Sequence, residues 1–360
     1  MSGPAAPAVY NPRPVVRIDG RSSERLGELL QAMEMREEEG GLTSLELRFS
    51  NIASDPDGGA DYAFEDEAEI SLGAAISVAA GDAAAPREIF RGLITALEAD
   101  FPGDGPPELV VLAEDRLQLA RMSRRTAIYR EMSLVDLVGQ IAGRCNLQPR
   151  VSGLTEHRES WVQFNESDLA FLRRLLRRFD ADLQVVEERL EVAPVSEIQR
   201  EVIELALFHE LRRVRFIADL AHQVTEVTSS GWDPLRGRSV SGSSRGLNFG
   251  PGRGRRGGDL LAQTLGRRRE HVGQVAVLTD QEAQALADTV FDRRARRFVC
   301  AEGTAEGHPG LRVGSHLRLT GVSRRFQNTY QVVRTLHRFD LREGYFTDFK
   351  AESATLGEAV

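Results

Sequence analysis

The sequence predicts a mainly β protein that carries an inserted α/β segment. Apolar residues alternate with polar ones through much of residues 45–113 and again through residues 317–349, which is the period of half-buried strands. Between these regions, residues 134–143 and the segment after Asn165 show helical spacing. At 360 residues, the chain exceeds the usual size of one core. Two main domains with an insertion are therefore expected.

The N-terminal region predicts a short arm and then a β domain. Residues 1–14 are rich in Pro and Ala and predict a flexible arm, and residues 15–18 predict a strand. A helix is expected next, ended by Gly40-Gly41. Its apolar positions are Leu26, Leu29, Leu30 and Met33. The alternating segments that follow favour an antiparallel barrel or sandwich over residues 15–127.

Residues 128–194 predict the inserted α/β domain. Ser133 stands three residues before Asp136 in an arrangement like a capping box, at the start of one helix. A second helix follows Asn165, and residues 183–192 alternate again. The arginines of the second helix are expected to form a solvated face: Arg173, Arg174, Arg177 and Arg178.

Residues 213–352 predict a second β domain, followed by a tail over residues 353–360. Thr279 and Glu282 indicate the start of a helix over residues 280–297, and short strands follow it.

An arginine-rich stretch, residues 236–269, interrupts the second β domain. It holds nine Arg and nine Gly, with Asp259 as the only acid, and this composition predicts a mobile loop. Clustered arginines could bind nucleic acid, but only Phe249 is aromatic and the whole chain is acidic. A loop that contacts protein is favoured, through Arg236, Arg238, Arg245, Arg253, Arg255 and Arg256.

Charge is distributed unevenly along the chain. The net charge is −8, yet the first 120 residues hold 23 Asp and Glu against nine Arg, a net charge of −14 that leaves +6 for the remainder. The two halves are therefore expected to face different partners. Cys145 and Cys300 lie far apart, the start shows no signal-like pattern, and no apolar run is long enough to cross a membrane. Synthesis and assembly in the cytoplasm are expected.

Patterns that could form a cofactor or metal site are better explained as structural. Gly252–Gly257 matches the dinucleotide fingerprint but lacks a convincing strand before it and helix after it. His209-Glu210 lacks the second histidine of a zinc-protease helix. Three histidines of one β region could converge on a metal, although scattered histidines are commoner: His308, His316 and His337. No metal or cofactor residue is assigned.

Candidate catalytic residues also have structural explanations. Glu166 and Asp168 suit a helix start better than a paired-carboxylate hydrolase. Cys145 lacks His and Asn companions in a motif, so a buried small side chain is expected there. No catalytic residue is assigned.

Three stretches of the chain match one known family in their order. Residues 163–175 contain a Gln, an aromatic residue, Glu-Ser-Asp and then a helix, in which the matching residues are Gln163, Phe164, Glu166, Ser167, Asp168, Phe171 and Leu175. Residues 90–95 precede them, and closing strands follow over residues 310–349. Together they resemble the phage late-control protein D family, which includes tail hub proteins and the hub portion of type VI secretion spike proteins.

The resemblance implies two antiparallel tube-like β-barrels per chain, the first completed by strands near residues 195–212. It further implies a homotrimer whose six barrels surround a channel. The implied function is that of a non-enzymatic baseplate hub, in a contractile phage tail or a related injection system. The implied partners are a separate trimeric spike protein, the inner tube or its initiator, and other baseplate proteins. The residues that replace the typical type VI turn, Phe179–Asp182, favour a phage-like or extracellular particle.

Two alternatives from other classes remain open. A cell-wall hydrolase or protease of the same particle would need a convergent acid pair or a His-Glu-metal set. A nucleic-acid-binding protein would act through residues 236–269.

Overall fold

The computed structural model describes residues 13–54, 60–65, 68–82, 84–154 and 158–357. Most of the predicted arm, residues 1–12, lies outside the described residues, as do residues 358–360 of the predicted tail. No helix in the described ranges is long and apolar enough to cross a membrane.

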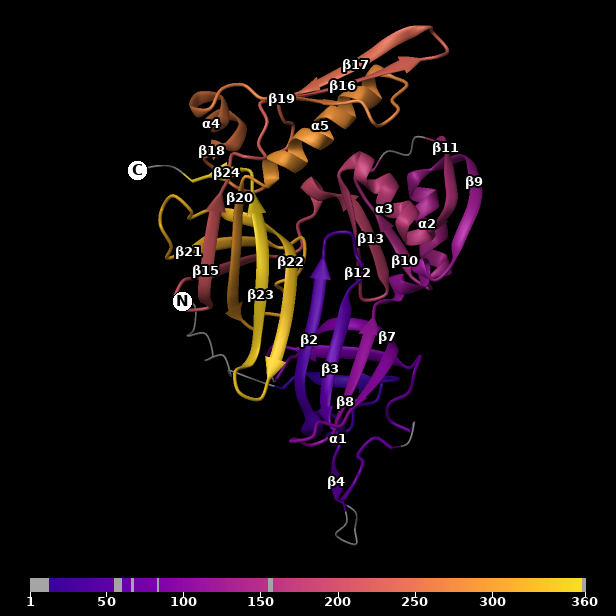
Figure 1. The fold of residues 1–360 in the computed structure, drawn as a ribbon, viewed down its shortest axis with the longest axis vertical. Helices are drawn as coiled ribbons and strands as arrows, with labels where there is room; N and C mark the ends of the chain where they lie inside the picture. Colours follow the sequence, from indigo (N-terminus) through magenta and orange to yellow (C-terminus); the bar gives the residue numbers. More distant parts are fainter. Residues whose placement is uncertain (1–12, 55–59, 66–67, 83, 155–157, 358–360) are drawn as a thin grey trace, which may run out of the picture.

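Within these ranges, twelve strands form one curled and mainly antiparallel sheet, which confirms the mainly β class (Figure 1). Ten of them follow the order β1-β6-β7-β8-β3-β2-β22-β23-β20-β15, while β21 pairs with β22 and β14 pairs with β21. The N-terminal strands are β1 (Val15–Ile18), β2 (Leu30–Glu38), β3 (Ser44–Ser50), β6 (Ala75–Ala80), β7 (Arg87–Asp100) and β8 (Glu108–Glu114). The C-terminal strands are β14 (Val202–Ala206), β15 (Leu211–Ala218), β20 (Val299–Glu306), β21 (His316–Thr320), β22 (Thr329–Asp340) and β23 (Gly344–Ser353).

The two groups of strands enclose separate cores but share one sheet. Antiparallel pairing of β2 with β22, in which Met35 lies opposite His337, joins them. Phe339 and Tyr345 from the C-terminal strands are buried in the N-terminal core. The expectation that strands near residues 195–212 complete the first barrel is wrong. Instead, β14 pairs with β21 and β15 pairs with β20, so these strands complete the C-terminal group.

The predicted first helix is much shorter than expected. Helix α1 ends at Leu29 (Glu24–Leu29), and the chain continues directly into β2. Strand β2 pairs on both sides, and a register shift between Leu30 and Ala32 interrupts its alternation. The irregularity gives the apolar residues a spacing that imitates a helix. Hydrogen bonding to two neighbouring strands overrides that local pattern.

The predicted insertion folds around its own core as an α/β unit. Ser133 and Ser167 cap its two α-helices, with Oγ of each accepting a hydrogen bond from the backbone N–H three residues later. This confirms the predicted capping at Ser133. The elements are η1 (Arg116–Arg121), β9 (Arg124–Ser133), α2 (Leu134–Arg144), β10 (Gln148–Val151), β11 (Arg158–Ser167), α3 (Asp168–Leu176), η2 (Arg177–Phe179), β12 (Ala181–Val186), β13 (Arg189–Pro194) and η3 (Val195–Glu197).

A third, smaller unit lies beside the C-terminal strands, where the hairpin β16–β17 packs along α5 (Figure 1). Thr279 caps α5 through a hydrogen bond from the backbone N–H of Glu282, as predicted. The elements of this unit are β16 (Glu226–Asp233), β17 (Arg238–Ser244), β18 (Arg255–Arg256), α4 (Gly257–Thr264), β19 (Arg269–Val272), α5 (Asp280–Arg296) and β24 (Thr355–Leu356). The pair β4 (Ala53–Ser54) and β5 (Ala60–Asp61) extends from the N-terminal strands.

The expectation of a loop without regular structure over residues 236–269 is wrong, because β17 and α4 lie within it. Its glycines have a packing role that composition does not show. A Cβ on Gly252 would lie 2.3 Å from Ser353 Oγ, and one on Gly254 would lie 2.1 Å from the carbonyl oxygen of Leu356. The glycines therefore allow this segment to approach the C-terminal strands closely.

The alternation of β2 can be tested by four single substitutions. Replacing the fully buried Met33 or Met35 by Ala is expected to lower the free energy of unfolding by about 2–5 kcal/mol. Replacing Glu34 or Arg36, which form an ion pair on the outer face, is expected to change it by less than about 0.5 kcal/mol. Urea denaturation measures both effects. Similar losses at all four positions would contradict the alternation.

Candidate assembly site

Two residues of the family-like motif, Gln163 and Asp168, belong to an internal hydrogen-bond network. Gln163 is fully buried on β11, where its Oε1 accepts from the Tyr129 hydroxyl at 2.9 Å. Its Nε2 donates to Asp168 Oδ1 at 2.8 Å, and the other oxygen of Asp168 accepts from Arg144 Nη1 at 2.9 Å. These hydrogen bonds join the paired strands β9 and β11 to α2 and α3, and each buried polar group in them has a partner.

The remaining motif residues divide between packing and exposure. Phe171 stacks on Tyr129 at a centroid distance of 5.7 Å, and Leu175 is buried in the same core. Glu166 forms an ion pair with Arg174 at 2.6 Å. Phe164 instead points to solvent and is 76% exposed.

Phe164 belongs to a strip of exposed apolar residues on the outer face of β9–β11. Val162 lies directly opposite Ile128 in the register of the two strands, and both are exposed. We call Ile128, Val162 and Phe164 the apolar strip. An exposed apolar surface of this kind is typical of an interaction site.

The six arginines expected to contact protein from residues 236–269 do not form one surface. Arg236, Arg238 and Arg245 lie on or next to the hairpin β16–β17. Arg238 forms an ion pair with Asp280 at 2.7 Å. Arg253 and Arg255 lie at the C-terminal segment, where Arg255 pairs with Leu356 in β24. Arg256 stacks over Phe249 at 4.0 Å from the ring centroid. Protein contact through these arginines stays a prediction.

The three histidines of the closing strands lie in different environments. His337 is fully buried, with Nδ1 2.8 Å from the Tyr345 hydroxyl and 3.2 Å from Thr347 Oγ1. Burial lowers its pKa to about 3, so it is neutral at physiological pH. His308 and His316 are half-buried, and burial lowers their pKa values as well. In the described part of the chain, no group of three or more His, Cys, Asp or Glu could hold a metal ion.

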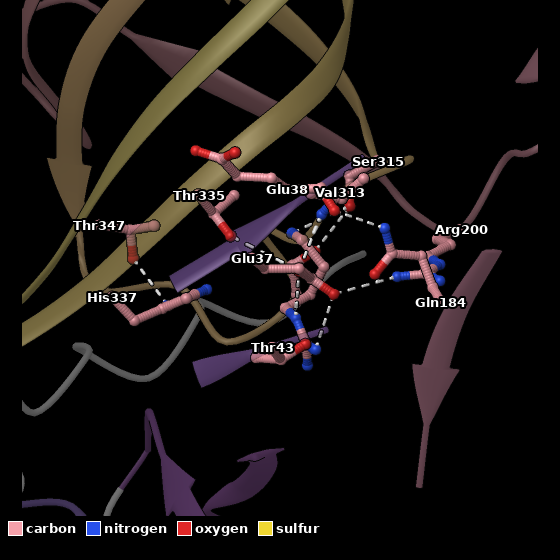
Figure 2. A network of polar contacts seen from close by, with 12 residues as sticks. Glu37, Glu38, Thr43, Gln184, Arg200, Val313, Ser315, Thr335, His337 and Thr347 are labelled. Carbon is pink, nitrogen blue, oxygen red and sulfur yellow. Dashed lines mark hydrogen bonds and ion pairs between the residues drawn. The ribbon is translucent and has the colours of Figure 1, made fainter. Parts of the chain in front are cut away.

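A buried carboxylate connects both groups of strands. Glu37 on β2 is fully buried and accepts hydrogen bonds from Arg312 Nε and Nη2 at 2.8 and 2.9 Å. The backbone N–H of Val313 donates to it at 3.0 Å, and Arg200 forms an ion pair at 3.6 Å. Figure 2 shows Glu37 surrounded by Val313, Thr335 and Arg200.

The charge of Glu37 depends on these partners. Although burial raises its pKa, the attraction and hydrogen bonds of Arg312, together with Arg200, lower it to about 2. No motif in the sequence marks this residue, because its partners are distant in sequence. Burial at an alternating position of β2 would have been the only signal, and the helical interpretation concealed it.

Ion pairs between side chains of adjacent strands lie along the outward face of the shared sheet. Glu38 on β2 lies 3.9 Å from Arg334 on β22, so the pattern crosses the junction between the two groups of strands. Further pairs between adjacent strands are Arg48–Glu108, Arg338–Asp348, Lys350–Glu302 and Arg212–Glu306. This charged face extends from β8 to β15 and suits contact with water.

The chain has a mainly β fold, and solved structures of phage tail proteins share that fold. A 43 kDa tail protein of prophage MuSo2 from Shewanella oneidensis is 12% identical, with a TM-score of 0.70 over 94% of this chain and 97% of that one. A tail protein from Neisseria meningitidis is 11% identical, with a TM-score of 0.68 over 96% and 97%. At these identities the similarity shows the fold alone.

An E. coli component of the type VI secretion system, described as structurally similar to the phage T4 tail proteins gp27 and gp5, is 15% identical. Its TM-score is 0.55 over 96% of this chain and 79% of that chain. No curated protein matches the sequence. The chain belongs to the family described as the Alg8 N-terminal domain, whose model matches residues 52–340.

Neutralising Glu37 tests the buried ion pairs. The Glu37→Gln variant is expected to lose about 3 kcal/mol of unfolding free energy near neutral pH, because the folded protein lowers this pKa from 4.5 to about 2. A lowered carboxyl pKa stabilises the fold above pH 4.5, and the effect disappears as the pH falls toward 2. Denaturation of wild type and variant across this range measures the difference.

The matched control is Glu46→Gln, because Glu46 forms an exposed pair with Arg48 on β3. This control should differ from wild type by less than about 0.5 kcal/mol at every pH. If the difference between wild type and Glu37→Gln stays constant on acidification, the buried charge is not its cause.

Proposed function

We propose that this protein is a non-enzymatic structural hub of a contractile phage tail or a related injection particle. The observation that carries the proposal is the single sheet shared by two groups of strands. Pairing of β2 with β22 holds the two groups in a fixed relation. Three copies of such a chain would therefore present six similar β surfaces around an axis. This is how a three-fold spike could be matched to a six-fold tube.

The charged face of the sheet supports a place beside a water-filled channel. Its ion pairs continue across the β2–β22 junction. Surface charges of both signs remain solvated and give no apolar contact to a passing molecule. The likeness in fold to tail proteins and to a type VI secretion component supports the same proposal. We also propose the division into two barrels and an insertion, predicted at residues 15–127, 213–352 and 128–194. In the structure η1 and β9 belong to the insertion, and β14 and β15 belong to the second group of strands.

The proposed partners follow from this role. They are two further copies of the chain, a separate trimeric spike protein, the inner tube or its initiator, and other baseplate proteins. The protein would be synthesised in the cytoplasm and assembled into the particle there. These expectations come from the three stretches of the sequence that resemble the late-control protein D family. In this proposal the family-like motif supports the insertion, and interfaces perform the function.

The first experiment is the mass of the purified protein in solution, alone and mixed with the spike protein encoded nearby. Each chain has a mass of 39.8 kDa. A particle of three chains, formed alone or only with the spike, is expected by mass photometry. If the chain remains monomeric and does not bind the spike protein, the hub proposal is wrong, and the hydrolase or nucleic-acid alternatives are favoured.

The apolar strip can be tested as the surface that joins the copies. Replacing both Ile128 and Phe164 by Asp is expected to dissociate the trimer, because burying two carboxylates in an apolar contact is unfavourable. Thermal stability of the single chain should change little, since both side chains are exposed. The control is Leu341→Asp at the exposed turn between β22 and β23. If the doubly substituted protein is still a trimer, the copies contact one another through a different surface, and the hub proposal is unaffected.

A further inference from the structure

Six arginines line one pocket between three parts of the molecule. The pocket has a volume of about 700 Å³ and lies between the turn from β2 to β3, the insertion near η2, and the end of α5. Its arginines are Arg36, Arg173, Arg177, Arg293, Arg296 and Arg297. Its carboxylates are Glu38, Glu39, Asp180 and Asp182. The formal charge of the lining is therefore positive.

Three of these arginines already have partners within the chain. Arg296 forms a bidentate ion pair with Asp180. Arg173 donates to the carbonyl oxygens of Gly40 and Gly41 at 2.6 and 2.7 Å. Arg36 pairs with Glu34, outside the pocket, at 2.8 Å.

The guanidinium groups of Arg177, Arg293 and Arg297 form no hydrogen bond or ion pair with any residue that the structure describes. Arg293 is half-buried, and burial lowers its pKa, with the positive charges of Arg177, Arg296 and Arg297 adding to the effect and Asp180 opposing it. These guanidinium groups therefore lie close enough to repel one another. Arg177 and Arg297 are exposed to solvent, so the three positive charges are accessible and together can attract an anionic group.

The carboxylates in the pocket do not compensate for these three charges. Asp182 accepts from the backbone N–H of Gly40 at 2.5 Å and from Gln184 Nε2 at 3.1 Å. Glu38 lies toward Arg334. Glu39 stands at the accessible rim, where desolvation in the pocket and the charge of Asp182 raise its pKa to about 7, so it is only partly ionised at neutral pH.

We propose that this pocket binds an acidic segment of a partner protein, whose carboxylates pair with Arg177, Arg293 and Arg297. A guanidinium binds a carboxylate with two parallel hydrogen bonds, and the chain uses this geometry twice nearby, in Arg296–Asp180 and Arg312–Glu37. Because the pocket lies between three parts of the fold, an occupant would also fix their relative positions.

The lining favours an acidic peptide over nucleic acid. It contains no aromatic side chain on which a base could stack. The pocket also accepts side chains but is too small for a duplex. The inference goes beyond the proposed hub because it names the chemistry of one partner, and it does not require the trimer.

Binding of a fluorescein-labelled hexaglutamate peptide, followed by anisotropy at low salt, tests the site. Wild type is expected to bind saturably, and the triple variant Arg177→Gln, Arg293→Gln, Arg297→Gln to bind at least about tenfold more weakly. The matched control triple, Arg324→Gln, Arg325→Gln, Arg342→Gln, removes the same charge from exposed positions. Its affinity should stay within about twofold of wild type. Equal losses in both triples, or no binding by wild type, would overturn the proposal.

Two further readouts separate binding from folding and from nucleic acid. The peptide should raise the Tm of wild type but not that of the pocket triple. Without peptide, the pocket triple should unfold at the same or a higher temperature, because repulsion between the arginines is removed. A single-stranded oligonucleotide of equal charge should bind more weakly than the peptide. If wild type binds the oligonucleotide more tightly than the peptide, and the pocket triple variant loses that binding, the ligand of the pocket is nucleic acid and the acidic-peptide proposal is wrong. The mass measurement tests the hub separately.

Discussion

The buried carboxylate of Glu37 is the interaction on which the arrangement of the two β groups depends. A buried charge is costly unless it is paired and hydrogen-bonded. Glu37 reaches this condition only when β2, Arg200 and the segment at Arg312 and Val313 come together. The position of β2 beside β22 therefore depends on the ion pairs of Glu37 as well as on the backbone hydrogen bonds between the two strands. A change in the relative position of the two groups would leave this carboxylate without partners.

The pairing of β2 with β22 also makes two small β groups into one extended surface. A strand at the edge of either group would otherwise expose unpaired backbone groups. Because β2 and β22 satisfy each other, the outward face is continuous and its ion pairs cross the junction. This continuous surface is the part of the fold on which the proposed hub function depends.

Arginine has three different roles in this molecule. Arg312 is largely buried and neutralises a carboxylate. Arg173 holds the insertion to the turn between β2 and β3, whereas Arg174 holds α3 to β11 within the insertion. Both residues are exposed, as the predicted solvated face requires, and each also forms hydrogen bonds within the chain. Arg177, Arg293 and Arg297 have the third role, in which the guanidinium group has no ion-pair partner among the described residues. Composition alone cannot separate these roles, because each depends on what lies opposite the guanidinium.

The sequence by itself determined the fold class, the α/β insertion and the caps at Ser133 and Thr279, because these depend on residues close together in the chain. The tertiary structure decided the strand identity of β2, where an irregular register hides the alternation. It also decided the conformation of the segment around Gly254. This segment has no core of its own and packs closely against the C-terminal strands. Glu37 and its arginines were beyond sequence reasoning for the same reason. Glu37 is separated from Arg200 and Arg312 by more than a hundred positions, and only the folded chain brings them together.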